Sequence, residues 1–223
     1  MEETALTRHT LVFLAPQGKV RLEAELYSAY FGEAQERLHD IFAGEADVPG
    51  IVRRAEEKPH SIAVGFVPWR RLENGNRLRV ATYVMEAEVR TAVSPYELDC
   101  GNLLVRSRAL EAAGKIYALA ADFKVKAGFW GSVGLEIATG LPYTDDASDL
   151  DVLLKPAAHD RLLGFYRQAQ RLCPGIAMDF EVELPNGYGV KLAELFMDTR
   201  TVLGKSLTDV RLLDKKQTAV FLQ

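Results

Sequence analysis

Apolar residues in the first hundred positions recur mainly with the two-residue period of β-strands. Residues 61–67 and 78–84 alternate in this way, and the Asn74-Gly75 pair between them is typical of a hairpin turn. Residues 10–14 form a shorter apolar run, whereas residues 26–43 carry apolar side chains at helical spacing. This part of the chain is therefore predicted to contain strands and turns with one helix.

Apolar residues in the second half follow a different pattern, in which helical and extended segments take turns. Helical spacing covers residues 102–123, the segment from Gly131 to Thr139 and residues 159–172, while strand-like runs occupy residues 125–130, 149–154, 178–184 and 189–192. This order, closed by a returning hairpin, predicts an α+β fold. Because Ser94-Pro95 interrupts the pattern, we expect a smaller N-terminal domain at residues 1–100 and a catalytic domain at residues 101–223.

The composition is that of an ordinary globular protein, with 48% apolar and 26% charged residues in a chain of 223. A formal net charge of -4 argues against broad nucleic-acid binding, which requires a basic surface. No stretch approaches the roughly 18 apolar residues of a membrane span, and the first four residues lack the positive start of a signal peptide. Cys100 and Cys173 form no CxxC pattern, so reduced thiols and a cytoplasmic location are expected.

Gly131-Ser132 lies between an apolar strand and a helix, a position suited to binding phosphate. Glycine lets the backbone approach a ligand closely, and the free N–H groups at the start of the helix attract phosphate oxygens. The serine hydroxyl is able to cap the helix or to donate to phosphate. An isolated Gly-Ser pair is more often a simple turn, so this motif gains weight only from the residues that follow.

Asp149 and Asp151 alternate with the apolar residues Leu150 and Val152. Side chains at positions i and i+2 of a strand point to the same side, so the two carboxylates are predicted to repel each other unless a cation lies between them. Mg²⁺ prefers carboxylate and phosphate oxygens and suits such a pair. The alternative is a solvated strand end in an acidic loop, which the apolar continuation to Leu154 makes less favourable.

The alternating segment Asp179-Phe180-Glu181 offers a third carboxylate, as a metal ligand or a general base. We select Glu181 first and Asp179 second, with an exposed strand face as the alternative. Lys205 follows Gly204 and is able to reach a phosphate as a point charge, although most surface lysines have no such role.

The combination of Gly131-Ser132, a helix and Asp149-x-Asp151 on a strand resembles the signature of the DNA polymerase β-like nucleotidyltransferase superfamily. The longer run from Gly131 to Leu141, followed by Tyr143 and residues 148–151, is similar to the malonate decarboxylase holo-acyl-carrier-protein synthase family. Members of that family are phosphoribosyl-dephospho-CoA transferases. Weaker matches extend the resemblance over nearly the whole chain: Arg8-His9, Leu11-Val12, residues 52–54, residues 184–187, Glu194 and residues 202–205.

The resemblance implies an N-terminal α/β domain and a polymerase β-like domain with a mixed sheet flanked by helices. It also implies transfer of a prosthetic group from 2'-(5''-triphosphoribosyl)-3'-dephospho-CoA to a serine of the malonate decarboxylase acyl carrier protein, with release of pyrophosphate. The residues assigned to catalysis are Asp149, Asp151 and Glu181, the first two as Mg²⁺ ligands, and those assigned to the substrate are Gly131, Ser132, Ser148 and Lys205. An acidic carrier protein is expected to dock on arginines; the candidates are Arg53, Arg54, Arg70, Arg71, Arg77 and Arg79.

Two other functions stay open from the sequence. A nucleotidyltransferase of the same superfamily could modify another protein, tRNA or a small molecule, and a non-catalytic module could bind nucleotide with the same fold. Labelled ATP and the triphosphoribosyl donor, each offered with several acceptors, would separate these activities. The Asp149 and Asp151 pair argues against the non-catalytic module, because a pure binding protein gains nothing from two repelling carboxylates.

Overall fold

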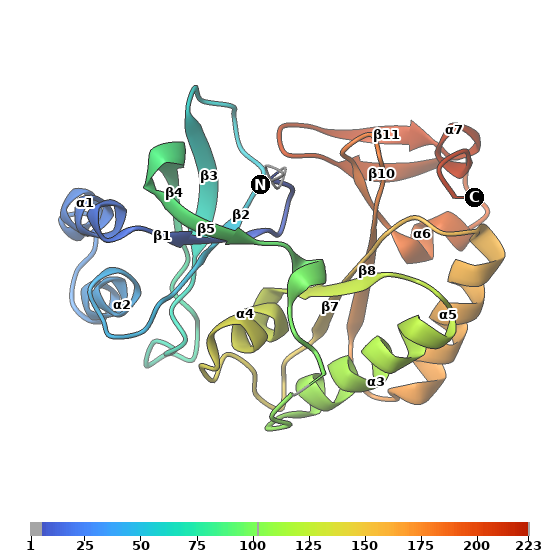
Figure 1. Cartoon of the computed structure of the whole chain (residues 1–223), viewed down its shortest axis with the longest axis horizontal. Coiled ribbons are helices and arrows are strands. Elements are labelled where there is room, and N and C mark those ends of the chain that lie inside the picture. The colour runs from blue at the N-terminus through green and yellow to red at the C-terminus, as the bar shows by residue number, and fades with distance from the viewer. Residues whose placement is uncertain (1–5, 102, 223) are drawn as a thin grey trace. The chain divides into compact units, whose positions relative to one another are not determined.

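The computed structural model describes residues 6–101 and 103–222, which belong to two compact units (Figure 1). The first unit is Met1–Ser94 and the second is Pro95–Gln223. Each unit combines helices with one sheet, so the predicted α+β class is confirmed. None of the helices in the described part of the chain has the length and apolar character that a bilayer span requires.

The first unit is built on a five-stranded sheet in the order β4-β3-β2-β1-β5, in which every neighbouring pair is antiparallel. Its strands are β1 (Leu11–Leu14), β2 (Gly50–Val52), β3 (Ser61–Phe66), β4 (Val80–Met85) and β5 (Val89–Val93). All four residues of β1 are buried, because this strand has a neighbour on each side. The strands predicted around residues 10–14, 61–67 and 78–84 are thus confirmed as β1, β3 and β4.

The prediction of a single helix over residues 26–43 is wrong. The structure has α1 (Pro16–Tyr27) and α2 (Glu33–Phe42), separated at Gly32, whose φ of 56° is incompatible with a continuous helix. The apolar spacing was misleading because Tyr27 and Phe31 are 51% and 81% exposed and belong to no buried stripe. The buried aromatic contact comes from α2, whose Phe42 packs edge-on against Phe66 of β3 with ring centroids 5.0 Å apart.

The second unit is built on a six-stranded mixed sheet in the order β11-β10-β9-β8-β7-β6. Its strands are β6 (Ala127–Trp130), β7 (Leu150–Leu154), β8 (Met178–Glu183), β9 (Gly189–Lys191), β10 (Thr201–Lys205) and β11 (Val210–Asp214). Its helices are α3 (Arg108–Asp122), α4 (Gly131–Thr139), α5 (His159–Leu172), α6 (Leu192–Phe196) and α7 (Lys215–Ala219). Among the strands described for this unit, β7 and β8 are the one parallel pair, and α5 makes the crossover between them.

The sequence predicted most elements of this unit to within two residues, but it placed the start of α3 too early. Ser107 is the N-cap of α3, and its hydroxyl accepts a hydrogen bond from Leu110 N at 3.3 Å, so residues 103–106 precede the helix. Asn102, the predicted first residue, lies outside the described residues. The hairpin of β10 and β11 was not predicted.

Strand β8 alternates polar and apolar side chains throughout, and β7 does so from Leu150 to Val152, before the apolar pair Leu153 and Leu154. Leu150 and Val152 of β7 are fully buried on one face, where Phe180 of β8 also lies. Phe165 of α5 closes this core, with its ring centroid 5.7 Å from that of Phe180. The opposite face of the two strands carries carboxylates, and these form the site described next.

Candidate active site

The bend at Gly131 joins β6 directly to α4 and needs glycine for two reasons. Its φ is 64°, in the left-handed region where residues with a side chain are strained. A Cβ atom at this position would also lie 2.2 Å from Oδ2 of Asp151, far inside van der Waals contact. The Asp151 carboxylate therefore lies directly against the bend between the strand and the helix.

The first turn of α4 presents backbone N–H groups at the same place. Trp130 is the N-cap residue, and its side chain makes no capping hydrogen bond to them. Ser132 is the second residue of this nine-residue helix and is half-buried. Uncapped N–H groups at a helix start, together with the helix dipole, favour an anion.

Asp149 and Asp151 lie at the start of β7. Asp149 is exposed and immediately precedes the strand, while Asp151 is its second residue and is half-buried. The strand register places Asp151 between Trp130 of β6 and Asp179 of β8. This register brings Asp151 together with the Gly131 bend on one side and with the carboxylates of β8 on the other.

The pKa of Asp151 reports on the charges that surround it. Burial and the neighbouring charges of Asp149, Asp179 and Glu181 together raise the pKa of this carboxyl from 3.8 to about 7, against the opposing charge of Lys191. Several carboxylates therefore act on Asp151 against one ammonium group. Such an excess of negative charge favours binding of a cation.

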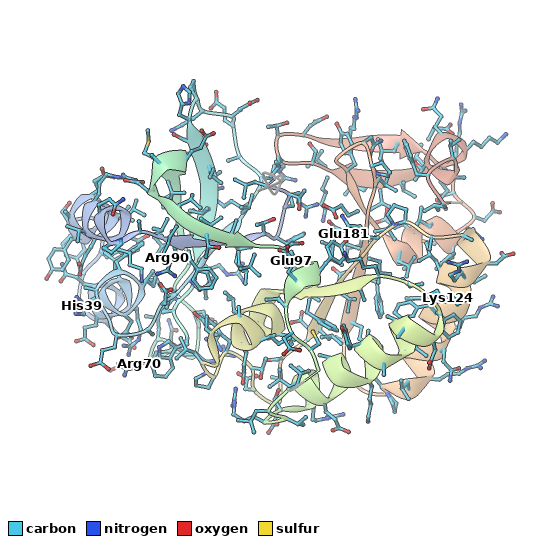
Figure 2. All side chains as sticks on the ribbon, in the orientation of Figure 1. His39, Arg70, Arg90, Glu97, Lys124 and Glu181 are labelled. Atoms are coloured by element: carbon cyan, nitrogen blue, oxygen red, sulfur yellow. The ribbon has the colours of Figure 1, made fainter. Side chains whose placement is uncertain are left out.

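On β8 the structure places Asp179, not Glu181, directly opposite Asp151. Asp179 Oδ2 accepts a hydrogen bond from Lys191 Nζ at 2.9 Å. Glu181, labelled in Figure 2, lies two residues further along β8, opposite Lys191 of β9, and is 7% exposed. Residue order alone could not separate these two carboxylates, because their proximity to Asp151 depends on the register of the parallel pair.

Lys191 was missed by the sequence reasoning, although a signal for it existed. The predicted turn at residues 185–187 is closed by a hydrogen bond from Gly187 N to Leu184 O at 3.0 Å. A hairpin about that turn pairs Glu181 with Lys191, as the structure shows. Extending the predicted turn into a strand register would have identified this lysine.

The two remaining substrate candidates are Ser148, in the turn before Asp149, and Lys205 of β10. The Ser148 hydroxyl accepts from Asp145 N at 2.9 Å and donates to Asp145 Oδ1 at 3.1 Å, so it closes the turn that precedes Asp149. Lys205 pairs with Gly189, which pairs with Glu183. Glu183 is four residues beyond Asp179 on β8, so Lys205 lies about 13 Å further along the strand direction.

The loop that leads to Asp149 is held by a buried glutamate, which the sequence reasoning did not identify. Arg106 donates to both carboxylate oxygens of Glu136, at 3.0 and 2.9 Å, and Thr144 donates to Glu136 Oε2 through its N–H at 2.6 Å and its hydroxyl at 2.8 Å. Burial raises the pKa of Glu136, but the bonds from Arg106 and Thr144 outweigh it and the net pKa is lowered. The loop is thereby fixed to α4.

The residues fit a metal ion that arrives with its substrate. Among residues 6–101 and 103–222, no three His, Cys, Asp or Glu side chains are close enough to hold a metal by themselves. Mg²⁺ commonly uses one or two carboxylates and completes its shell with substrate phosphate and water. Asp151, which lies against the start of α4, and Asp149, two residues before it in the chain, would supply such carboxylates.

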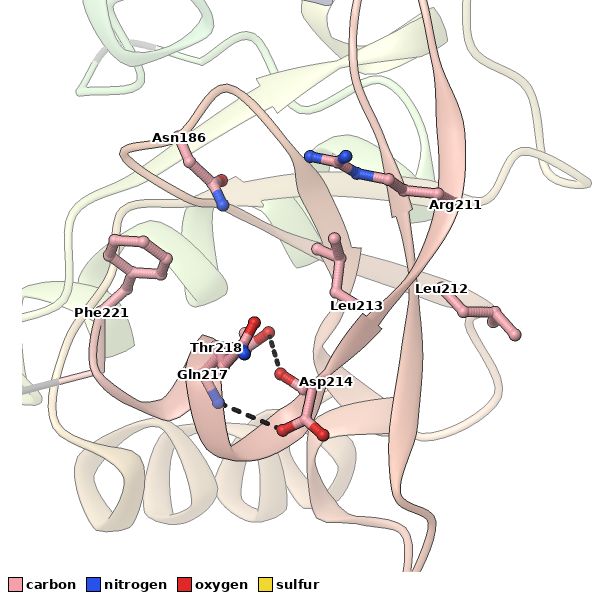
Figure 3. Close-up of a pocket in the computed structure, with 8 residues that line it drawn as sticks. All are labelled: Asn186, Arg211, Leu212, Leu213, Asp214, Gln217, Thr218 and Phe221. Atoms are coloured by element: carbon pink, nitrogen blue, oxygen red, sulfur yellow. Dashed lines mark hydrogen bonds between the residues drawn. The ribbon is translucent and has the colours of Figure 1, made fainter.

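A cavity of about 370 Å³ lies elsewhere in the second unit, beside β11 and α7 (Figure 3). Its lining residues are Asn186, Arg211, Leu212, Leu213, Asp214, Gln217, Thr218 and Phe221. The Asp214 carboxylate accepts from Lys216 N at 2.8 Å and caps α7. None of the predicted site residues lines this cavity.

The six candidate docking arginines do not form one surface of the first unit. Arg53 and Arg54 lie in the connection from β2 to β3, before β3 begins. The other four lie in the connection from β3 to β4, after β3 ends. The Arg53 side chain donates to Val64 O of β3, and Arg77 donates to Trp69 O at 2.6 Å, so both are engaged with main-chain oxygens. Arg70, labelled in Figure 2, stacks on Trp69 with 4.6 Å to the ring centroid.

Comparison with known proteins gives the same answer for both units. The phosphoribosyl-dephospho-CoA transferase MdcG C-terminal domain matches residues 98–216, and the N-terminal domain of the same transferase matches residues 7–95. Two relatives are the phosphoribosyl-dephospho-CoA transferases of Xanthomonas euvesicatoria pv. vesicatoria (strain 85-10) and Xanthomonas axonopodis pv. citri (strain 306). Each is 29% identical over 212 residues, which is 93% of this chain and 94% of the relative. No solved structure matches significantly. The chain therefore belongs to the phosphoribosyl-dephospho-CoA transferase family and is a transferase.

Proposed function

We propose that the protein transfers phosphoribosyl-dephospho-CoA from its 5''-triphosphate to a serine of the malonate decarboxylase acyl carrier protein, with a divalent metal at Asp149 and Asp151. The observation that carries this proposal is the contact between the Asp151 carboxylate and the Gly131 bend. This contact places the proposed cation site, on β7, next to the proposed anion site at the start of α4. The order β6-α4-β7 around them also supports a polymerase β-like second unit.

Each group at the bend has a separate part in holding the donor. The first N–H groups of α4 and the Ser132 hydroxyl bind the β- and γ-phosphates, where the absence of a side chain on Gly131 leaves room. Asp149 and Asp151 hold Mg²⁺, which when bound neutralises the charge that builds up on the leaving pyrophosphate. The donor is thereby oriented with its α-phosphorus towards the acceptor serine.

The covalent step forms a bond from the serine oxygen to the α-phosphorus and breaks the bond to pyrophosphate. The serine proton must leave as this bond forms, and a carboxylate within reach is able to accept it. The position of Asp179 opposite Asp151 supports a role for Asp179 in adding negative charge beside the metal, while its own carboxylate is held by Lys191. Glu181, buried two residues further along β8, then serves as the proton acceptor.

The acceptor is an acidic carrier protein, and the connection from β3 to β4 offers a basic surface for it. Between residues 67 and 79 this segment contains Arg70, Arg71, Arg77 and Arg79 against a single acid, Glu73. The Glu33 carboxylate holds Glu73 N at 2.9 Å, which fixes the segment to α2. Complementary charge of this kind mainly raises the association rate and is screened by salt.

Intact-protein mass spectrometry tests the proposed reaction. The apo carrier protein, the triphosphoribosyl donor and Mg²⁺ are incubated with the enzyme, with tRNA and unrelated small proteins as competing acceptors. We expect the carrier alone to gain the mass of the donor less pyrophosphate, and a carrier in which the acceptor serine is alanine to gain nothing. A mass gain on another acceptor would refute the assignment of the acceptor, and no gain with any acceptor would refute the reaction.

A further inference from the structure

A second charged group lies on the same sheet face as the carboxylates, and it is basic. Lys155 N donates to Lys126 O at 2.9 Å, which pairs these residues across β6 and β7. The row continues through Glu183 of β8 and Gly189 of β9 to Lys205 of β10. Three lysines thus share one row of the sheet with one carboxylate.

The aspartates and this lysine row lie on one face because of strand alternation. Asp151 and Lys155 are four residues apart on one strand, as are Asp179 and Glu183, and an even separation keeps side chains on one side. The two rows are therefore about 13 Å apart along the strands. One face of the sheet has a negative end at the Gly131 bend and a positive end at Lys126.

An aromatic ring organises the positive end. Lys155 Nζ lies 4.5 Å from the ring centroid of Tyr96, and Lys126 Nζ lies 5.6 Å from the same centroid. Lys155 Nζ also contacts Glu183 Oε2 at 2.6 Å. Gly128 lets Tyr96 approach this closely, because a Cβ there would lie 2.6 Å from the carbonyl carbon of Pro95. Two ammonium groups are thus gathered around one ring, beside the carboxylates of Glu183 and Glu181.

We propose that the lysine row binds the diphosphate that joins adenosine to the pantetheine arm of the donor. This inference rests on the proposed function, which places the triphosphate at the Gly131 bend. The donor carries two polyphosphate groups with two ribose rings between them, a span of the same order as the separation of the rows. Its diphosphate keeps a negative charge on each phosphorus and matches the ammonium groups of Lys126 and Lys155.

Lys126→Gln is the test variant, because Lys126 is exposed and its change removes charge without opening the core. We expect about tenfold weaker binding of 3'-dephospho-CoA at low salt, the loss that corresponds to one hydrogen bond to a charged group. The KM for the donor should rise by a similar factor while kcat stays the same, and Lys126→Arg should restore both. Lys115→Gln, an exposed lysine on α3, serves as the matched control.

Calorimetry with two probes separates this inference from the proposed function. Lys126→Gln should weaken binding of dephospho-CoA but leave binding of Mg²⁺-tripolyphosphate unchanged, whereas Asp151→Asn should do the reverse. Unchanged dephospho-CoA affinity in Lys126→Gln would refute binding of the diphosphate by the lysine row, and so would a raised KM for the carrier protein in place of the donor. Either result leaves the transfer reaction, and hence the proposed function, intact. If the wild type neither transfers the group nor binds tripolyphosphate, the proposed function fails, and the lysine row fails with it.

Discussion

Asp151→Asn is expected to lower kcat about a thousandfold while the protein stays folded. The amide keeps the shape of the side chain but removes the charge that lies between the Gly131 bend and Asp179. A steady-state transfer assay at saturating Mg²⁺ measures the loss, and circular dichroism checks the fold. Asp122→Asn, the same change at an exposed position on α3, should keep full activity.

The same variant should be more stable than the wild type at neutral pH, in the absence of divalent ions. The pKa of Asp151 is about 7 in the folded chain against 3.8 without the fold, so the ionised carboxylate destabilises the native state. This penalty is absent below pH 3.8, grows as the pH rises and is complete above about pH 7. The melting temperature of Asp151→Asn should therefore exceed that of the wild type by about 3 °C or more at pH 8, and by little at pH 4.

Two results for Asp151→Asn would contradict these predictions. Near-normal turnover of the variant would show that the chemistry lies elsewhere, and lower stability at pH 8 would show that Asp151 supports the fold.

Gly131→Ala is expected to lower kcat/KM by about a hundredfold, because misplacement of catalytic groups by about 1 Å has effects of this size. The new methyl group would overlap Asp151 Oδ2 and push the carboxylate out of place. The left-handed backbone adds strain of about 1–3 kcal/mol, which a urea unfolding curve should show as a lower midpoint.

Gly187→Ala separates the two effects of this substitution. Gly187 has a φ of 82°, but a Cβ atom there would meet nothing within 4 Å. It should lose stability to a similar degree and keep its activity. If the two alanine variants were equally active, the contact between Gly131 and Asp151 would have no part in catalysis.

The sequence was sufficient where a local signal determines the structure. α5 was predicted at its observed bounds because its apolar stripe is regular, and β7 was predicted because two aspartates alternate with buried Leu150 and Val152. The spacing of apolar residues gave a wrong prediction at α1 and α2, because exposed aromatic residues fall at the positions expected for a buried helical stripe. Their break depends on the backbone at Gly32, which periodicity does not report.

The finer structure of the site depends on pairings between distant residues. Whether Asp179 or Glu181 lies beside Asp151 is decided by the register of β7 and β8, which no residue pattern within one strand determines. The ion pair of Arg106 with Glu136 joins residues 30 positions apart, and it appears only once α3 and α4 have packed. Lys191 was within reach of sequence reasoning, because a predicted tight turn defines the pairing that follows it.

Anomalous diffraction from crystals grown with Mn²⁺ and the donor tests the central claim most directly. We expect one Mn²⁺ peak bridging the carboxylates of Asp149 and Asp151 to donor phosphate oxygens, with the β- and γ-phosphates at the first turn of α4. Mn²⁺ bound away from both aspartates, or a triphosphate bound away from Gly131, would contradict the account.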